Sequence, residues 1–207
     1  MTLKLLNNEV EYINENYPNI RNYNKLHIDS CIYLKSITLL PNITKLYISN
    51  CPNLQLILNN SIYIEKIAII NCFNLRSLPN KLTNLTYLYL YDSNIKKISK
   101  SYFNLKTLII KYNKNKKFQI KEIPSYNNLL TLILENCNKL KKLPDKLPKI
   151  NKIYIISCFY IEDVPDNYTT IKEYYMYYTV NNIFIKSIYF KINMDDFYDF
   201  DDYSNYE

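Results

Sequence analysis

Residues 64–79 read IEKIAIINCFNLRSLP, and this stretch contains the unit that repeats along the chain. Its apolar residues recur at a fixed spacing on both sides of a single cysteine, and the neighbouring segments show the same spacing every 20–24 residues. The positions equivalent to that cysteine are Asn8, Cys31, Cys51, Cys72, Ser93, Asn113, Cys137, Cys158 and Thr179. A regular period of this length is typical of a stacked solenoid, in which each coil contacts its two neighbours.

The composition fits one soluble globular domain. The 207 residues are 48% apolar and 22% charged, and no apolar run is long enough for a membrane span. Asn and Glu interrupt the first residues too early for a signal peptide, so we expect an intracellular, cytoplasmic protein. The chain has no glycine and is rich in Asn, Ile, Lys and Tyr, which indicates an AT-rich genome such as that of a large DNA virus or a protist. In the viral case the expected location is the host cytoplasm.

Each repeat contains a short piece in which apolar and polar residues alternate, for example KLYIS (45–49). Such pieces predict short strands with one buried face, and identical strands in successive coils must stack in parallel. Proline follows the last core position of several coils, where it fixes the backbone and removes a donor. We therefore expect extended or 3₁₀ return segments instead of long helices. These prolines are Pro41, Pro79, Pro124, Pro144 and Pro165.

The segments LPNKLTNLTYLYL (78–90) and LPDKLPKINKIYI (143–155) resemble the short bacterial-effector-type repeats of the leucine-rich-repeat family. The resemblance covers roughly residues 3–184. It implies a leucine-rich-repeat solenoid of the α/β repeat class, mostly parallel β, with about nine coils and short 3₁₀ or extended convex segments. Residues 1–184 would form the solenoid and 185–207 a C-terminal cap and acidic aromatic tail. The chain departs from the family in two ways: the ladder position is mostly Cys instead of Asn, and KNKKFQ (114–119) is inserted in the fifth full copy.

The cysteine column invites a functional interpretation, but a structural one is favoured. In the family, the side chain at this position bonds to neighbouring backbone groups, and a small buried thiol can do the same. Side chains stacked in parallel do not converge on a tetrahedral metal ion. The odd number of five cysteines, none in a C-x-x-C pair, also fits reduced thiols in a reducing compartment. We therefore predict neither a disulfide framework nor a metal site.

Catalysis has little support in the sequence. His27 is the only histidine, and the absence of glycine leaves no phosphate-binding loop or oxyanion turn of the usual kind. His27 and Asp29 share one face of a predicted strand, where we interpret them as a solvated pair and not as a catalytic dyad. The expectation is a protein without enzymatic activity, cofactor or metal.

The concave face, formed by strand positions that point away from the core, is unusually rich in Tyr and Ile. Tyr provides a large contact area with few rotatable bonds, which suits a protein-binding surface. The interpretation is a monomeric protein–protein interaction module with an unknown partner, although an AT-rich genome could produce the same residues without one. The predicted contact residues are Tyr47, Ile70, Tyr87, Tyr89, Tyr91, Ile109, Ile133, Tyr154, Ile156 and Tyr175.

Charge supports a second hypothesis, binding of nucleic acid or another polyanion by the repeat body. Residues 1–194 carry 26 basic and 13 acidic side chains, and Lys25, Lys45 and Lys66 recur at one repeat position. Residues 195–207 carry six acids and no base. We expect this segment to be disordered, as is usual for a run of like charges. Other interpretations are a cap on the last coil through its aromatic residues, an interaction peptide, or an internal mask of the basic body.

Overall fold

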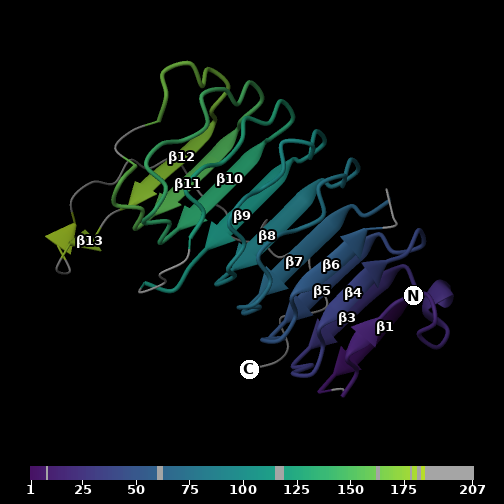
Figure 1. Ribbon diagram of the computed structural model, residues 1–207. Coiled ribbons are helices and arrows are strands. Elements are labelled where there is room, and N and C mark those ends of the chain that lie inside the picture. The colour runs from purple at the N-terminus through teal and green to yellow at the C-terminus, as the bar shows by residue number, and fades with distance from the viewer. Residues whose placement is uncertain are drawn as a thin grey trace.

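The computed structural model describes residues 1–7, 9–59, 63–114, 119–161, 164–177, 179–180 and 183–184. Nine short parallel strands stack side by side into one main sheet, with the chain passing behind it between successive strands (Figure 1). The strands, in spatial order, are β1 (Thr2–Leu6), β3 (Lys25–Asp29), β5 (Lys45–Ser49), β7 (Lys66–Ile70), β8 (Tyr87–Tyr91), β9 (Thr107–Lys111), β10 (Thr131–Glu135), β11 (Lys152–Ile156) and β12 (Glu173–Tyr177). The molecule is therefore a parallel-strand β-solenoid, as expected.

The number of turns is slightly smaller than expected. Nine strands match the nine predicted repeat copies, but the solenoid has about seven turns. The strands at the two ends of the sheet each have a neighbour on one side only. Seven strands are therefore enclosed by a coil on both sides.

The core lies between the main sheet and the return segments. In the strands from β1 to β11 of this sheet, the second and fourth side chains point into it, as Leu88 and Leu90 do in β8. Burying a side chain of this kind stabilises the fold by roughly 1.5–3 kcal/mol. The register places equivalent residues of neighbouring coils directly beside one another, so Ile67 of β7 lies beside Leu88. Each coil therefore depends on its neighbours for burial.

A left-handed residue turns the chain out of most strands. The seven positions have φ between 48° and 54°. Glycine usually occupies this region, but this chain has no glycine, and Asn, Asp and Ser take its place. The fifth full copy differs, because Tyr112 takes this place with a buried ring whose hydroxyl accepts a hydrogen bond from the Ile120 backbone N–H at 3.0 Å. The left-handed positions are Asn7, Ser30, Asn50, Asn71, Asp92, Asn136 and Ser157.

The return segments contain a second, smaller sheet that the sequence did not predict. Strands β2 (Tyr12–Ile13), β4 (Ser36–Leu39) and β6 (Leu56–Asn59) pair in parallel behind the first coils. The prediction of extended or 3₁₀ returns is otherwise confirmed, with one 3₁₀ turn, η1, at Ile20–Asn22. The sheet ends after β6, and Pro79, one repeat after Leu58, has no N–H to continue it.

Side chains also connect the returns of successive coils. The Tyr102 hydroxyl donates to the Pro79 carbonyl at 2.7 Å, and the Tyr126 hydroxyl donates to the Ser99 carbonyl at 2.9 Å. Asn104 Nδ2 donates to the Thr83 carbonyl at 2.9 Å. These bonds satisfy backbone carbonyls that a helix would otherwise have paired internally.

After the main sheet, β13 (Thr179–Val180) and β14 (Ile183–Phe184) form an antiparallel pair. Most of the insertion at 114–119 and the whole predicted cap and tail at 185–207 lie outside the described residues. In the described part of the chain, no helix has the length and apolar character that crossing a bilayer requires.

Candidate binding surface on the main sheet

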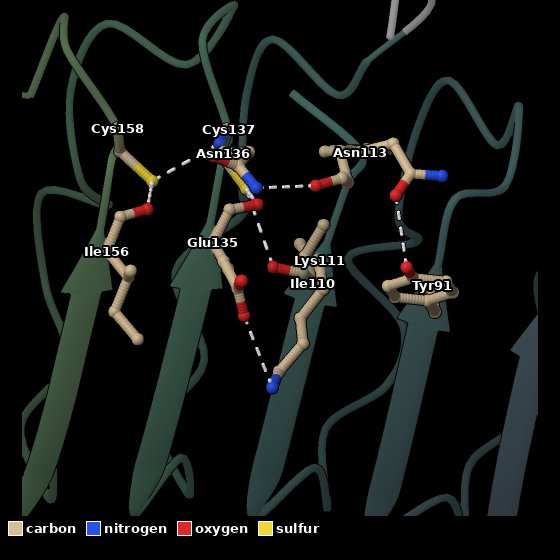
Figure 2. Close-up of polar contacts among 10 residues, drawn as sticks. Tyr91, Ile110, Lys111, Asn113, Glu135, Asn136, Cys137, Ile156 and Cys158 are labelled. Atoms are coloured by element: carbon tan, nitrogen blue, oxygen red, sulfur yellow. Dashed lines mark hydrogen bonds and ion pairs between the residues drawn. The ribbon is translucent and has the colours of Figure 1, made fainter. Parts of the chain in front are cut away.

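The cysteine column is a structural ladder, which confirms its interpretation from sequence. All five thiols are buried and reduced. The thiol of Cys51 donates to the Ser49 carbonyl at 3.2 Å, and that of Cys72 to the Ile70 carbonyl at 3.3 Å. Figure 2 shows the same arrangement in the later coils, where Cys158 Sγ donates to the Ile156 carbonyl at 3.4 Å and accepts from the Cys137 N–H at 3.2 Å.

The electrostatics of these thiols do not favour nucleophilic chemistry in the later coils. Burial raises the pKa of the Cys137 thiol well above its ordinary value. A nucleophilic cysteine needs a lowered pKa together with solvent access. Cys137 has neither, and it therefore acts as a rung between adjacent coils.

We use the term sheet face for the side of the main sheet that points away from the core. It consists of the first, third and fifth residues of the nine strands, which form three columns in register. The central column contains Lys4, His27, Tyr47, Ala68, Tyr89, Ile109, Ile133, Tyr154 and Tyr175. The sheet face corresponds to the face that the sequence predicted as concave and protein-binding.

The apolar residues of the central column form a second hydrophobic cluster, separate from the main core. Ile109, Ile133 and Tyr154 are only 5–6% exposed, although they lie on the outer side of the sheet. Tyr87 and Tyr89 pack against them. Neighbouring strands in a sheet are about 4.8 Å apart, so large side chains in one column cover each other. The three inner residues thus hold the surface together, while the half-buried tyrosines around them remain accessible.

The other predicted contact residues flank this cluster. Tyr47, Ile70, Tyr91 and Ile156 are half-buried on the sheet face. The backbone of Tyr175 pairs with Tyr154 in register, but its side chain lies outside the described part of the structure. Desolvation raises the pKa of Tyr87 to about 12, and desolvation is also the main reason that the pKa of Tyr89 is raised. Both phenols are therefore neutral hydrogen-bonding groups at physiological pH.

Polar contacts border the cluster where the strands end. Lys111 Nζ lies 3.3 Å from Glu135 Oε2, and the Tyr91 hydroxyl donates to Asn113 Oδ1 at 3.1 Å (Figure 2). Asn113 Nδ2 in turn donates to Asp92 at 2.8 Å. These pairs fix the polar rim of the surface.

The His27 and Asp29 pair takes part in packing and hydrogen bonding. The His27 ring meets the Tyr47 ring edge-on, with centroids 4.6 Å apart. Burial lowers the pKa of His27, partly offset by the charge of Asp29. The Asp29 carboxylate accepts from Ser30 Oγ at 2.9 Å and Asn50 Nδ2 at 3.0 Å, and also from Ser49. Asp29 therefore links two successive coils at the edge of the sheet where the strands end.

In the first column of the sheet face, three lysines in register follow Thr2 of β1. Lys25 pairs with Lys45, and Lys45 with Lys66, on adjacent parallel strands. We call these three residues the lysine column. The Lys66 ammonium lies 5.8 Å from the centroid of the Tyr87 ring, so the basic and aromatic parts of the face are in contact.

No group of three or more His, Cys, Asp or Glu side chains in the described part of the chain is placed to hold a metal ion. Sequence reasoning missed the near-complete burial of Ile109, Ile133 and Tyr154 in the central column. The sequence did contain an indication of this burial, because large residues occupy that column in consecutive copies and must cover one another.

Comparison with known proteins gives two distant similarities. No family model matches the sequence and no solved structure matches it. Two proteins of Arabidopsis thaliana are each 26% identical to this chain: "Probable disease resistance protein At4g19520" over 73% of the chain, and "Disease resistance protein RPS4B" over 67%. These regions make up 9% and 12% of the respective relatives, so the chain spans only a small part of their length.

Proposed function

We propose that this protein is a non-catalytic interaction module that binds another protein on its sheet face. The observation that supports this most directly is the second hydrophobic cluster, Ile109, Ile133 and Tyr154 with Tyr87 and Tyr89, on the outer side of a parallel sheet. Parallel sheets are normally covered on both faces, because each face is apolar. Among the described residues, the return segments lie on one face of the main sheet and no element covers the other, which suits docking of a partner there.

The size of the sheet face suits such a contact. Nine strands at about 4.8 Å spacing and five residues each give a surface of roughly 650 Å². A standard protein–protein interface buries about 800 Å² on each partner. Tyrosines in the centre, with a polar rim such as the Lys111 and Glu135 pair, match the usual anatomy of an interface. The similarity to disease resistance proteins is compatible with a repeat-type interaction role.

The test is capture of binding proteins by the purified chain, compared between two double variants. Tyr89→Ala with Tyr91→Ala removes two tyrosines of the sheet face. Tyr33→Ala with Tyr160→Ala is the matched control, since those tyrosines are 50% and 60% exposed outside the sheet face. We expect partners to be lost from the first variant and retained by the control. Equal capture by both, with circular dichroism showing both folded, would rule out the sheet face as the binding surface.

The lysine column favours a second candidate, binding of a polyanion such as single-stranded nucleic acid. Like charges directly opposite in a sheet destabilise it, so an anionic ligand on Lys25, Lys45 and Lys66 would stabilise the fold. Phosphate-driven binding must weaken steeply with salt. Titration of a labelled oligonucleotide between about 50 and 200 mM salt tests this. Binding that ignores salt, or that survives Lys25→Ala with Lys45→Ala, argues against it.

A further inference from the structure

Basic and aromatic side chains lie next to each other on the first half of the sheet face. The lysine column occupies β3, β5 and β7, with Tyr47 also on β5, and the adjacent strand β8 carries Tyr87, Tyr89 and Tyr91. The cation of Lys66 over the Tyr87 ring joins the two groups of side chains. A ligand that matches this surface would carry acidic and aromatic side chains close together.

The lysine column has few acids nearby to balance it. Among the described residues, neither Lys25 nor Lys45 has an acidic side chain within ion-pair distance. Asp29, on the same strand as Lys25, is engaged by Ser30 and Asn50 at the other end of that strand. The ammonium groups of Lys25 and Lys45, which are in register, therefore repel one another across strands about 4.8 Å apart.

The chain itself contains a segment with the complementary chemistry. Residues 193–207, NMDDFYDFDDYSNYE, carry six acids, no base, and five aromatic side chains. Residues 1–194 carry an excess of thirteen positive charges. The acids occur in pairs and at alternating positions among the aromatics, so one short segment could place carboxylates and rings on adjacent parts of the sheet face.

The connecting length is sufficient. After the β13–β14 pair, ten residues, 185–194, precede the first of these acids, and these ten together with the thirteen residues 195–207 span up to about 76 Å when extended. The lysine column begins at β3, seven strand spacings from β12, which is roughly 34 Å. The segment can therefore reach every lysine of the column.

We propose that residues 193–207 bind in cis to the sheet face, with their carboxylates on the lysine column and their aromatic rings against the neighbouring tyrosines. This inference rests on the proposed function, because the segment would occupy the same surface as the partner. It would act as an internal competitor that a partner must displace. Part of the affinity is electrostatic and falls as salt shortens the Debye length.

Zero-length carbodiimide cross-linking of the full chain, followed by mass spectrometry of the monomeric species, tests the proposal. We expect amide cross-links from Lys25, Lys45 or Lys66 to acids of 195–207, and fewer of them at high salt. Lys25→Glu with Lys45→Glu removes two of the reactive amines and should also suppress the cross-links from Lys66, whose amine is unchanged. Lys96→Glu with Lys97→Glu is the control, since it makes the same charge change at exposed residues of the return side and should leave the cross-links intact.

Several outcomes would overturn the proposal. These are cross-links spread equally over return-side lysines such as Lys141 and Lys142, cross-links found only in dimers, and loss of cross-links in the control variant. Should the charge-reversed variant fail to fold, Lys25→Gln with Lys45→Gln replaces it. Failure of the cis contact leaves the Tyr89 and Tyr91 capture result unchanged, so the two proposals fail separately.

Discussion

Ser93 is the position where the thiol ladder is interrupted, and replacing it with cysteine should stabilise the protein. Its side chain is fully buried, and Ser93 Oγ has no hydrogen-bond partner in the described part of the chain. The equivalent thiols of Cys51, Cys72 and Cys158 reach the carbonyl two residues earlier at 3.2–3.4 Å. A C–S bond is longer than a C–O bond, so a thiol at position 93 can reach the Tyr91 carbonyl.

The size of the effect follows from the unpaired hydroxyl. A buried polar group without a partner costs about 1–3 kcal/mol. Allowing for imperfect fit of the larger sulfur, Ser93→Cys should raise the free energy of unfolding by about 1 kcal/mol. For a domain of this size that corresponds to a Tm increase of about 2–4 °C.

Thermal and urea denaturation followed by circular dichroism, with reductant present, measure the change. Cys51→Ser is the reciprocal variant, which we expect to lower stability by about 1 kcal/mol because the hydroxyl would not reach the Ser49 carbonyl equally well. The reasoning is refuted if Ser93→Cys is neutral or destabilising while Cys51→Ser leaves stability unchanged. Thiol and hydroxyl would then be equivalent in the ladder.

Three further changes have defined expectations. Tyr102→Phe leaves the buried Pro79 carbonyl without its donor and should lower the free energy of unfolding by about 1–2 kcal/mol in urea denaturation, an effect absent from Phe103→Ala on the exposed side of the same turn. Burial raises the pKa of Tyr87 to about 12 and also raises the pKa of Tyr126, so these tyrosines ionise at lower pH in the unfolded chain than in the folded protein. Their contribution to stability is therefore complete below about pH 10 and should be lost as the pH rises toward 12. Urea midpoints measured at successive pH values will show this loss. Lys111→Ala breaks a half-exposed ion pair with Glu135 and should lower the free energy of unfolding by less than about 1 kcal/mol. A larger coupling energy in a double-mutant cycle with Glu135→Ala would show that the pair stabilises the rim more than its exposure suggests.

The strands and the ladder could be predicted from sequence because both depend on local patterns repeated many times. Alternation such as KLYIS fixes which side chains of a strand are buried, and one column of cysteines marks the turn that follows. The left-handed turn residues were also visible as Asn, Ser or Asp before that column, since these residues occupy positive φ more readily than others.

Contacts between coils could not be predicted in the same way. The small sheet β2–β4–β6 depends on return segments of different coils lying in register, and no single copy encodes that pairing. The burial of residues in the central column of the sheet face likewise depends on neighbouring coils and is not encoded in any single copy. Ile109 and Ile133 point away from the core as predicted, but neighbouring side chains cover them, so their exposure depends on the stack and not on the strand.

Hydroxyl-radical footprinting of the chain with a captured partner is the most direct test of the proposed binding surface. The method reports the solvent access of individual tyrosines, and this chain has tyrosines both on and off the sheet face. We predict that partner binding protects Tyr87, Tyr89 and Tyr91 and leaves Tyr33 and Tyr160 as reactive as in the free protein. Protection of Tyr33 and Tyr160 with unchanged labelling of the sheet-face tyrosines would contradict the proposal.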